Sequence, residues 1–299
     1  MPRPALVLLL SVFALFPARA SAQEGGAPEV VETTGGPVVI DTRWSDGSPR
    51  RAEVDLVRGG SRVRAFEGRT VRTAAAANGD VVAVGYYHGG PEPFAGVVLV
   101  DLASGRRSEA SIPVAGARSP LRPAGLVITS DAQGFAIVLQ EQQADPNAEV
   151  RSVFARIALD GTWREPPHDA SIPWGLAALA SRPDGTYELA VLFGGFGDAR
   201  AGQARICIVT LRDSGQPTEH PWWASANASL TDVRIAGSAA GIDLFYRTVE
   251  GRLVHHAFAQ DGSWGREPAA GDVVLELSPA QSFYVSRQGG AATARTHTP

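Results

Sequence analysis

Two kinds of hairpin alternate along this chain, and their order limits the possible folds more than any other feature of the sequence. Hairpins of the first kind have a tight turn after a run of strand-forming residues, at Asp46-Gly47, Ser104-Gly105, Asp160-Gly161, Ser214-Gly215 and Asp261-Gly262. Hairpins of the second kind turn near Asn78-Gly79, Gln133-Gly134, Asp184-Gly185, Ala240-Gly241 and Ala280-Gln281. The glycines of the first kind recur about every 50 residues. A repeat of this length with two hairpins per period is typical of a four-stranded β-propeller blade.

The number and order of the hairpins predict an all-β fold, a single β-propeller of five four-stranded blades. Four blades are expected to be continuous in sequence, at about 70–114, 122–171, 173–224 and 230–270. The hairpins near 37–57 and 273–288 are then left without partners, and we expect them to pair as a fifth blade that closes the ring and removes exposed sheet edges. The run "SRVRAFEG" at 61–68 stays unassigned. Six or seven blades remain an alternative, as does a β-sandwich, although a sandwich does not predict two alternating kinds of hairpin.

The first 22 residues have the layout of a secretory signal peptide. Arg3 precedes an apolar stretch, and Ala20-Ser21-Ala22 offers small residues for cleavage. The apolar stretch is shorter than the roughly 20 residues that a membrane span requires, so no membrane insertion is expected. We therefore expect a secreted or periplasmic protein, with a flexible segment at 23–36, a propeller domain at 37–288 and a flexible tail at 289–299.

Composition excludes several classes of partner and chemistry. The chain has 27 basic and 31 acidic residues and no basic cluster, which argues against nucleic acid as a partner. Its single cysteine, Cys207, cannot form an internal disulfide and is expected to be a small buried hydrophobe. The sequence contains no nucleophile elbow, no zinc-protease helix motif and no phosphate-binding glycine loop. We expect a monomer that needs no cofactor and no metal.

The hairpin at 251–268 carries a motif with a partial copy elsewhere in the chain. An apolar strand with His255 and His256 leads to the turn Asp261-Gly262, and Trp264 follows. At 152–167, Asp160, Gly161 and Trp163 repeat this pattern, with Arg156 where the histidine would align. The motif resembles the repeat of bacterial β-propeller lectins and tectonin-like proteins. This resemblance implies a blade unit in a lectin-like protein, and we expect both tryptophans to pack against neighbouring strands.

The links between hairpins are the predicted binding regions, because they are long and rich in aromatic residues and histidine. They span 86–96, 140–151, 166–174, 193–204 and 219–230. In a propeller these links share one face, and binding residues concentrate on loops that a rigid scaffold presents. Aromatic rings beside polar groups suit recognition of sugars or peptides. The predicted ligand-binding residues are His88, Phe94, His168, Trp174, Phe196, His220, Trp222 and Trp223.

The function predicted from these loops is non-enzymatic binding of a carbohydrate or a protein. The alternative is a secreted glycoside hydrolase, which would need two carboxyl groups facing each other near the centre of the ring. The runs expected to be innermost offer mainly Glu276, with Asp232 and Asp272 at their edges. These carboxylates are too few, and mostly on one side of the ring, so the sequence does not predict catalysis.

Overall fold

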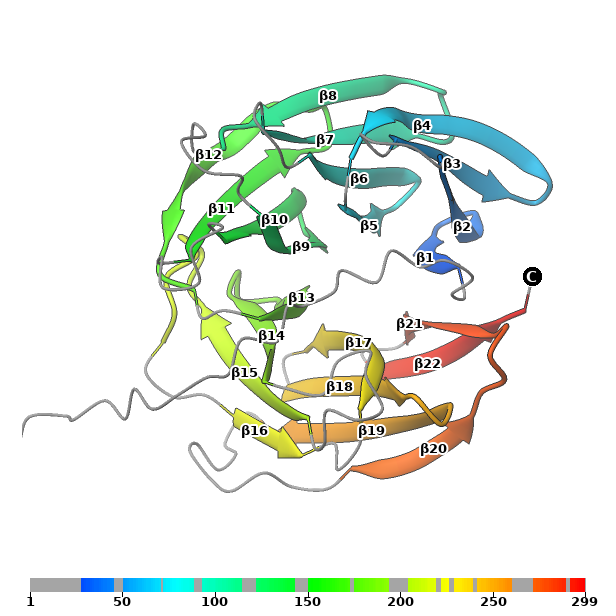
Figure 1. Cartoon of the computed structure of the whole chain (residues 1–299), viewed down its shortest axis with the longest axis vertical. Coiled ribbons are helices and arrows are strands. Elements are labelled where there is room, and N and C mark those ends of the chain that lie inside the picture. Colours follow the sequence, from blue (N-terminus) through cyan, green and yellow to red (C-terminus); the bar gives the residue numbers. More distant parts are fainter. Residues whose placement is uncertain are drawn as a thin grey trace, which may run out of the picture.

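The chain folds into blades of antiparallel strands arranged around a centre, as the computed structural model in Figure 1 shows. The structure describes residues 28–45, 51–70, 72–88, 93–114, 122–142, 150–172, 175–193, 204–218, 222–225, 229–238, 241–259, 271–288 and 291–298. Every regular element in these ranges is a strand. The described part of the chain accordingly contains no helix of the length and apolarity that a membrane crossing requires.

Five blades have four strands each, which confirms the predicted fold and blade count. Blade 1 comprises β1 (Glu29–Thr33), β2 (Gly36–Trp44), β3 (Arg51–Arg58) and β4 (Ser61–Arg69). Blade 2 comprises β5 (Arg72–Asn78), β6 (Val81–His88), β7 (Phe94–Asp101) and β8 (Arg107–Ile112). Blade 3 comprises β9 (Arg122–Asp131), β10 (Gly134–Gln142), β11 (Arg151–Ala158) and β12 (Trp163–Ala170).

The last two blades follow the same plan, with the innermost strand first. Blade 4 comprises β13 (Leu176–Ser181), β14 (Tyr187–Phe193), β15 (Arg205–Leu211) and β16 (Trp222–Ser225). Blade 5 comprises β17 (Leu230–Gly237), β18 (Gly241–Thr248), β19 (Arg252–Ala259) and β20 (Asp272–Glu276). A further hairpin of two strands, β21 (Ser282–Gln288) and β22 (Ala291–His297), completes the described chain.

The predicted pairing of 37–57 with 273–288 is wrong, because both ends of the chain find partners close by in sequence. Blade 1 is complete within residues 29–69: β1 lies in the segment expected to be flexible, and β4 is the run left unassigned. At the other end β21 pairs with β22, which occupies the expected tail. Pairing across short turns closes small loops at little entropic cost. In blade 1 such a turn is Gly59-Gly60, where both residues have the positive φ that glycine adopts freely.

Most of the predicted turns lie where the alternation places them. The second-kind turns at Asn78-Gly79, Gln133-Gly134, Asp184-Gly185 and Ala240-Gly241 join first and second strands. The segment at Ala280-Gln281 instead connects β20 to β21, so β20 is the outer strand of blade 5. Of the first-kind turns, Asp46-Gly47 and Asp261-Gly262 lie outside the described residues, as does Trp264.

The hydrophobic core is a series of layers between adjacent blades. Val54 and Leu56 of blade 1 pack with Val82 and Val84 of blade 2, and similar clusters join each later pair of blades. Trp163 is half-buried against the layer between blades 2 and 3, as expected. Cys207 is buried as expected, and burial raises the pKa of its thiol to about 12.

The hairpin β21–β22 lies between blades 5 and 1, with β21 against the inner strands β1 and β17. Phe283 of β21 packs with Phe245 and Leu253 of blade 5, and β21 also lies against β1. The apolar side of blade 1 faces blade 2. The opposite side of blade 1 carries charged side chains, among them Arg43, Asp55 and Arg62, and the arginines stay partly exposed.

Candidate ligand-binding site

Several predicted site residues lie outside the described residues or away from the predicted loops. Trp174, Phe196 and His220 belong to the first group. Trp222 and Trp223 form part of β16, where they pair with Ile208 and Cys207 of β15. These two residues therefore belong to β16, the outermost strand of blade 4, where the sequence analysis places a link between hairpins. Pairing of the short segment with β15 extends the blade to four strands.

His168 is on the outer strand of blade 3 and ties that blade to blade 4. Its Nε2 lies 3.0 Å from the carbonyl oxygen of Ser214, and its Nδ1 lies 3.1 Å from that of Pro166. Burial opposes the charged form of the ring, but hydrogen bonds to the two carbonyls raise the pKa of His168. Two acceptors require both ring nitrogens to donate, which only the imidazolium can do. His168 therefore acts as a structural contact between blades.

His88 and Phe94 are brought together by the link between β6 and β7. The two residues are opposite each other in the register, and their ring centroids are 4.9 Å apart. The Phe94 side chain is 40% exposed, whereas His88 is 8% exposed and its Nδ1 is buried without a hydrogen-bond partner. Burial and the nearby Arg69 lower the pKa of His88, so its ring is neutral at neutral pH. The pair presents an aromatic surface on the predicted face.

A hollow of about 350 Å³ lies at the end of blade 1 where β2 connects to β3. Its lining residues come from the ends of β2 and β4 and the start of β3: Arg43, Trp44, Ser45, Arg51, Glu53 and Glu67. The connection from β2 to β3 is equivalent to the one from β6 to β7, so the hollow lies on the same propeller face as His88 and Phe94. Trp44 packs partly against the core between blades 1 and 2, which holds its indole in place.

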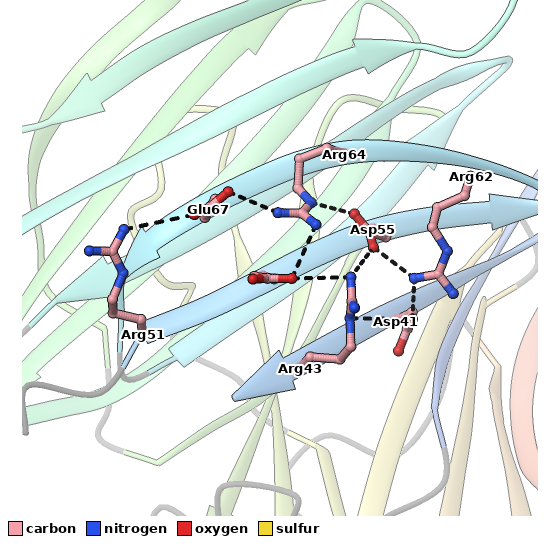
Figure 2. A network of polar contacts seen from close by, with 8 residues as sticks. Asp41, Arg43, Arg51, Asp55, Arg62, Arg64 and Glu67 are labelled. Carbon is pink, nitrogen blue, oxygen red and sulfur yellow. Dashed lines mark hydrogen bonds and ion pairs between the residues drawn. The ribbon is translucent and has the colours of Figure 1, made fainter. Parts of the chain in front are cut away.

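A network of ion pairs fixes the charged side chains around the hollow, as Figure 2 shows. Asp55, only 2% exposed at its side chain, accepts hydrogen bonds from Arg43 Nη2 at 2.5 Å, Arg62 Nη1 at 2.7 Å and Arg64 Nε at 2.5 Å. Burial acts against its charge, but the three guanidinium groups hold the pKa of Asp55 below its usual range.

The network extends from Asp55 to the carboxylates that line the hollow. Arg64 contacts Glu67 at 2.9 Å and Glu53 at 3.1 Å, while Arg43 contacts Glu53 at 3.2 Å. Arg51 reaches Glu67 only at 3.9 Å. Arg51 and Glu67 are exposed, and Glu53 is half-buried. The hollow therefore offers donors and acceptors that are positioned in advance, which lowers the entropic cost of binding a polar ligand.

A glycoside hydrolase would need two carboxyl groups that face each other near the centre of the ring. Glu29 of β1 and Asp232 of β17 both contact Arg234, whose Nη1 lies 3.4 Å from Glu29 and whose Nε lies 3.3 Å from Asp232. Burial raises the pKa of both carboxyl groups, and Arg234 partly offsets this effect. Asp272 and Glu276 are on the outer strand β20, far from the position expected for them.

This arrangement does not match a glycosidase pair. The two carboxyl groups of a glycosidase flank open space, which the scissile bond and in some enzymes a water molecule occupy. Here a guanidinium lies between Glu29 and Asp232 and neutralises charge on both. The arrangement instead connects blade 5 to blade 1 across the centre of the ring.

Comparison with known proteins identifies the fold and no family. No protein-family model and no curated protein sequence matches the chain. The chain is similar in structure to an α-L-arabinanase from Penicillium chrysogenum complexed with arabinobiose, with a TM-score of 0.58, 8% identity, and coverage of 89% of this chain and 86% of that one. It is also similar to AofleA from Arthrobotrys oligospora, with a TM-score of 0.52, 12% identity and coverage of 91% and 78%.

A weaker similarity links the chain to the fucose-specific lectin from Aleuria aurantia. The TM-score is 0.45 and the identity 13%, over 81% of this chain and 77% of the lectin. At identities of 8% and 12%, the arabinanase and AofleA establish a shared fold and nothing further. A shared fold does not determine a function, so the function has to be argued from the site.

Proposed function

We propose that the protein is an exported, monomeric, non-enzymatic module that binds a carbohydrate in the hollow of blade 1. The observation that carries the proposal is the juxtaposition of Trp44 with Arg51, Glu53 and Glu67 around one hollow. The part of Trp44 that lines the hollow offers apolar surface to the C–H groups of a sugar, while guanidinium and carboxylate groups bind its hydroxyls. The similar arabinanase was solved with arabinobiose, which supports a sugar over a protein as the ligand.

The geometry at the centre of the ring supports binding over hydrolysis. With Arg234 between Glu29 and Asp232, neither carboxyl group faces the other across free space. The carboxylates around the hollow are likewise paired with arginines, so none is placed to act as a general acid. A hydrolase remains the alternative function and is tested below.

The decisive experiment is a glycan array on the purified protein, followed by calorimetric titration of the best glycan. We expect Trp44→Ala to weaken binding at least about tenfold, because it removes the apolar surface for the sugar ring. Trp163→Ala is the matched control, since Trp163 packs between blades 2 and 3 and should affect stability without affecting affinity. Equal affinity in Trp44→Ala and the native protein would refute the assignment of the hollow.

The hydrolase alternative has its own test. The protein is incubated with the bound glycan and with aryl arabinofuranosides, and released sugar is measured. Turnover that is lost in Glu29→Gln and Asp232→Asn would establish a glycosidase at the centre of the ring. We expect no turnover.

A further inference from the structure

Strand β20 at the edge of blade 5 is unusual among the described strands because its whole length is exposed. All five of its residues are exposed, and its three apolar residues retain large accessible fractions: 55% for Val273, 49% for Val274 and 42% for Leu275. Within the described residues, Phe94 is the only other large hydrophobic side chain with comparable exposure. β20 is last in the strand order of its sheet, so no other strand of the described residues pairs with its outer backbone groups.

Other outer strands carry features that discourage pairing with another chain. β12 contains Pro166 and Pro167, which cannot donate a backbone hydrogen bond, and β8 exposes Arg107 and Glu109. Charges and prolines of this kind protect natural sheet edges. Between its two ends β20 has neither proline nor charge. Its exposed edge therefore suits addition of an extended segment, which gains backbone hydrogen bonds and apolar contacts together.

The ends of β20 determine which segment fits. Asp272 and Glu276 flank the apolar residues. If two copies of β20 paired antiparallel about Val274, Asp272 of each would face Glu276 of the other, and parallel pairing in register would place like residues together. Like charges directly opposite each other destabilise a strand pair. A second copy of the chain is therefore a poor occupant, whereas a segment with basic ends is complementary.

We propose that β20 is a docking edge for an extended segment of a partner protein that has an apolar centre and a basic residue at each end. The segment adds antiparallel to β20 as a fifth strand of blade 5. This surface lies on a different blade from the hollow that we assign to the carbohydrate, so a partner protein and a sugar would occupy separate sites. The inference does not depend on the proposed function.

The test uses two labelled peptides with the same centre, Arg-Thr-Val-Ile-Val-Thr-Arg and Glu-Thr-Val-Ile-Val-Thr-Glu, in fluorescence anisotropy titrations. We expect the basic-ended peptide to bind on the order of tenfold more tightly at low salt, with the difference shrinking at high salt. The double variant Asp272→Lys/Glu276→Lys should reverse this preference. An unchanged preference, or no binding of either peptide, would overturn the proposal.

A second variant tests whether the peptide adds at the strand edge. Val274 lies at a register shift in the pairing of β19 with β20, so Val274→Pro should leave that pairing intact while blocking addition of another strand. We expect it to abolish binding of the basic-ended peptide. If Val274→Pro does not fold, the charge-reversal result decides alone. Sedimentation that shows a native dimer, dissociated by Val274→Lys, would instead make a second copy the occupant and refute the proposal.

Discussion

At the scale of single residues, Asp55 shows how ion pairs stabilise the side of blade 1 that faces away from blade 2. Its carboxylate is nearly inaccessible and contacts three arginines, while the arginines stay partly exposed. A buried carboxylate is costly unless it is paired and hydrogen-bonded, and here three charged donors satisfy that need. The outer side of blade 1 thus replaces apolar packing with a balanced set of charges.

Replacement of Asp55 by asparagine should destabilise the protein by about 1.5–3 kcal/mol, the range for hydrogen bonds to charged groups. Since the pKa of Asp55 is lowered in the folded state, its contribution is present above the unfolded value near 4 and is lost as pH falls through the folded value. Thermal melts between pH 2 and 6 should therefore show the native protein approaching Asp55→Asn in acid. A stability difference that does not change over this range would contradict the account.

The contribution of His168 to the stability of the fold should have the opposite pH dependence. Its pKa is raised in the folded protein, so its contribution is full below about pH 6.5 and disappears as pH rises through the raised value. We expect the stability difference between the native protein and His168→Gln to shrink from pH 6 to pH 8.5. Denaturant titrations at each pH measure it, with His297→Gln on β22 as the control. A difference that grows with pH would be inconsistent with hydrogen bonds from an imidazolium.

At the scale of elements, hairpin turns could be predicted because Asp-Gly and Asn-Gly determine local geometry, whereas two terminal strands could not. β22 is alanine-rich with weak strand propensity, and β1 has only five residues; packing against β21 and its neighbours stabilises what propensity does not.

The strand β1 was not predicted, and the hairpin at 37–57 was therefore taken as the two outer strands of a blade, whereas it forms the second and third. The turn at Asp46-Gly47 was therefore assigned to the tight hairpins and not to the long links, so Trp44 and Arg51 were not predicted to line a hollow. His88 and Phe94 lie opposite each other because the β6–β7 link joins these two strands, as the alternation of hairpins predicts.

The hairpin β21–β22 should depend on one aromatic contact. Phe283 is buried and packs with Phe245 and Leu253, and it is the fully buried aromatic residue that the hairpin contributes to this cluster. Phe283→Ala should cost about 3–5 kcal/mol because it leaves a cavity in this layer. Chemical denaturation gives the change in free energy, and Val285→Ala, at the margin of the same layer, should cost less. Equal costs for the two variants would show that the hairpin is not held at Phe283.

At the scale of the whole molecule, the ring is closed by packing instead of by a blade built from both termini. Five complete blades precede the hairpin, and blade 5 meets blade 1 through β21 and through the ion pair between Glu29 and Arg234. Each blade is thus formed by neighbours in sequence, and only the last contact is long-range. With closure of this kind, each blade can stay folded when the contact between blades 5 and 1 is lost.

A chain that ends at residue 277 tests whether the blades stay folded in this way. It keeps all five blades but exposes Phe245 and Leu253 and removes the cover of β1, so we expect it to fold and to melt at a lower temperature than the full chain. Hydrogen exchange should then accelerate in β1 and β17, which adjoin the missing hairpin, and stay slow in β9 and β13 on the far side of the ring, because local stability follows local packing. Uniform acceleration in all five inner strands would mean that the ring, and not the blade, is the cooperative unit. An unchanged melting temperature would mean that blades 5 and 1 close the ring without the hairpin.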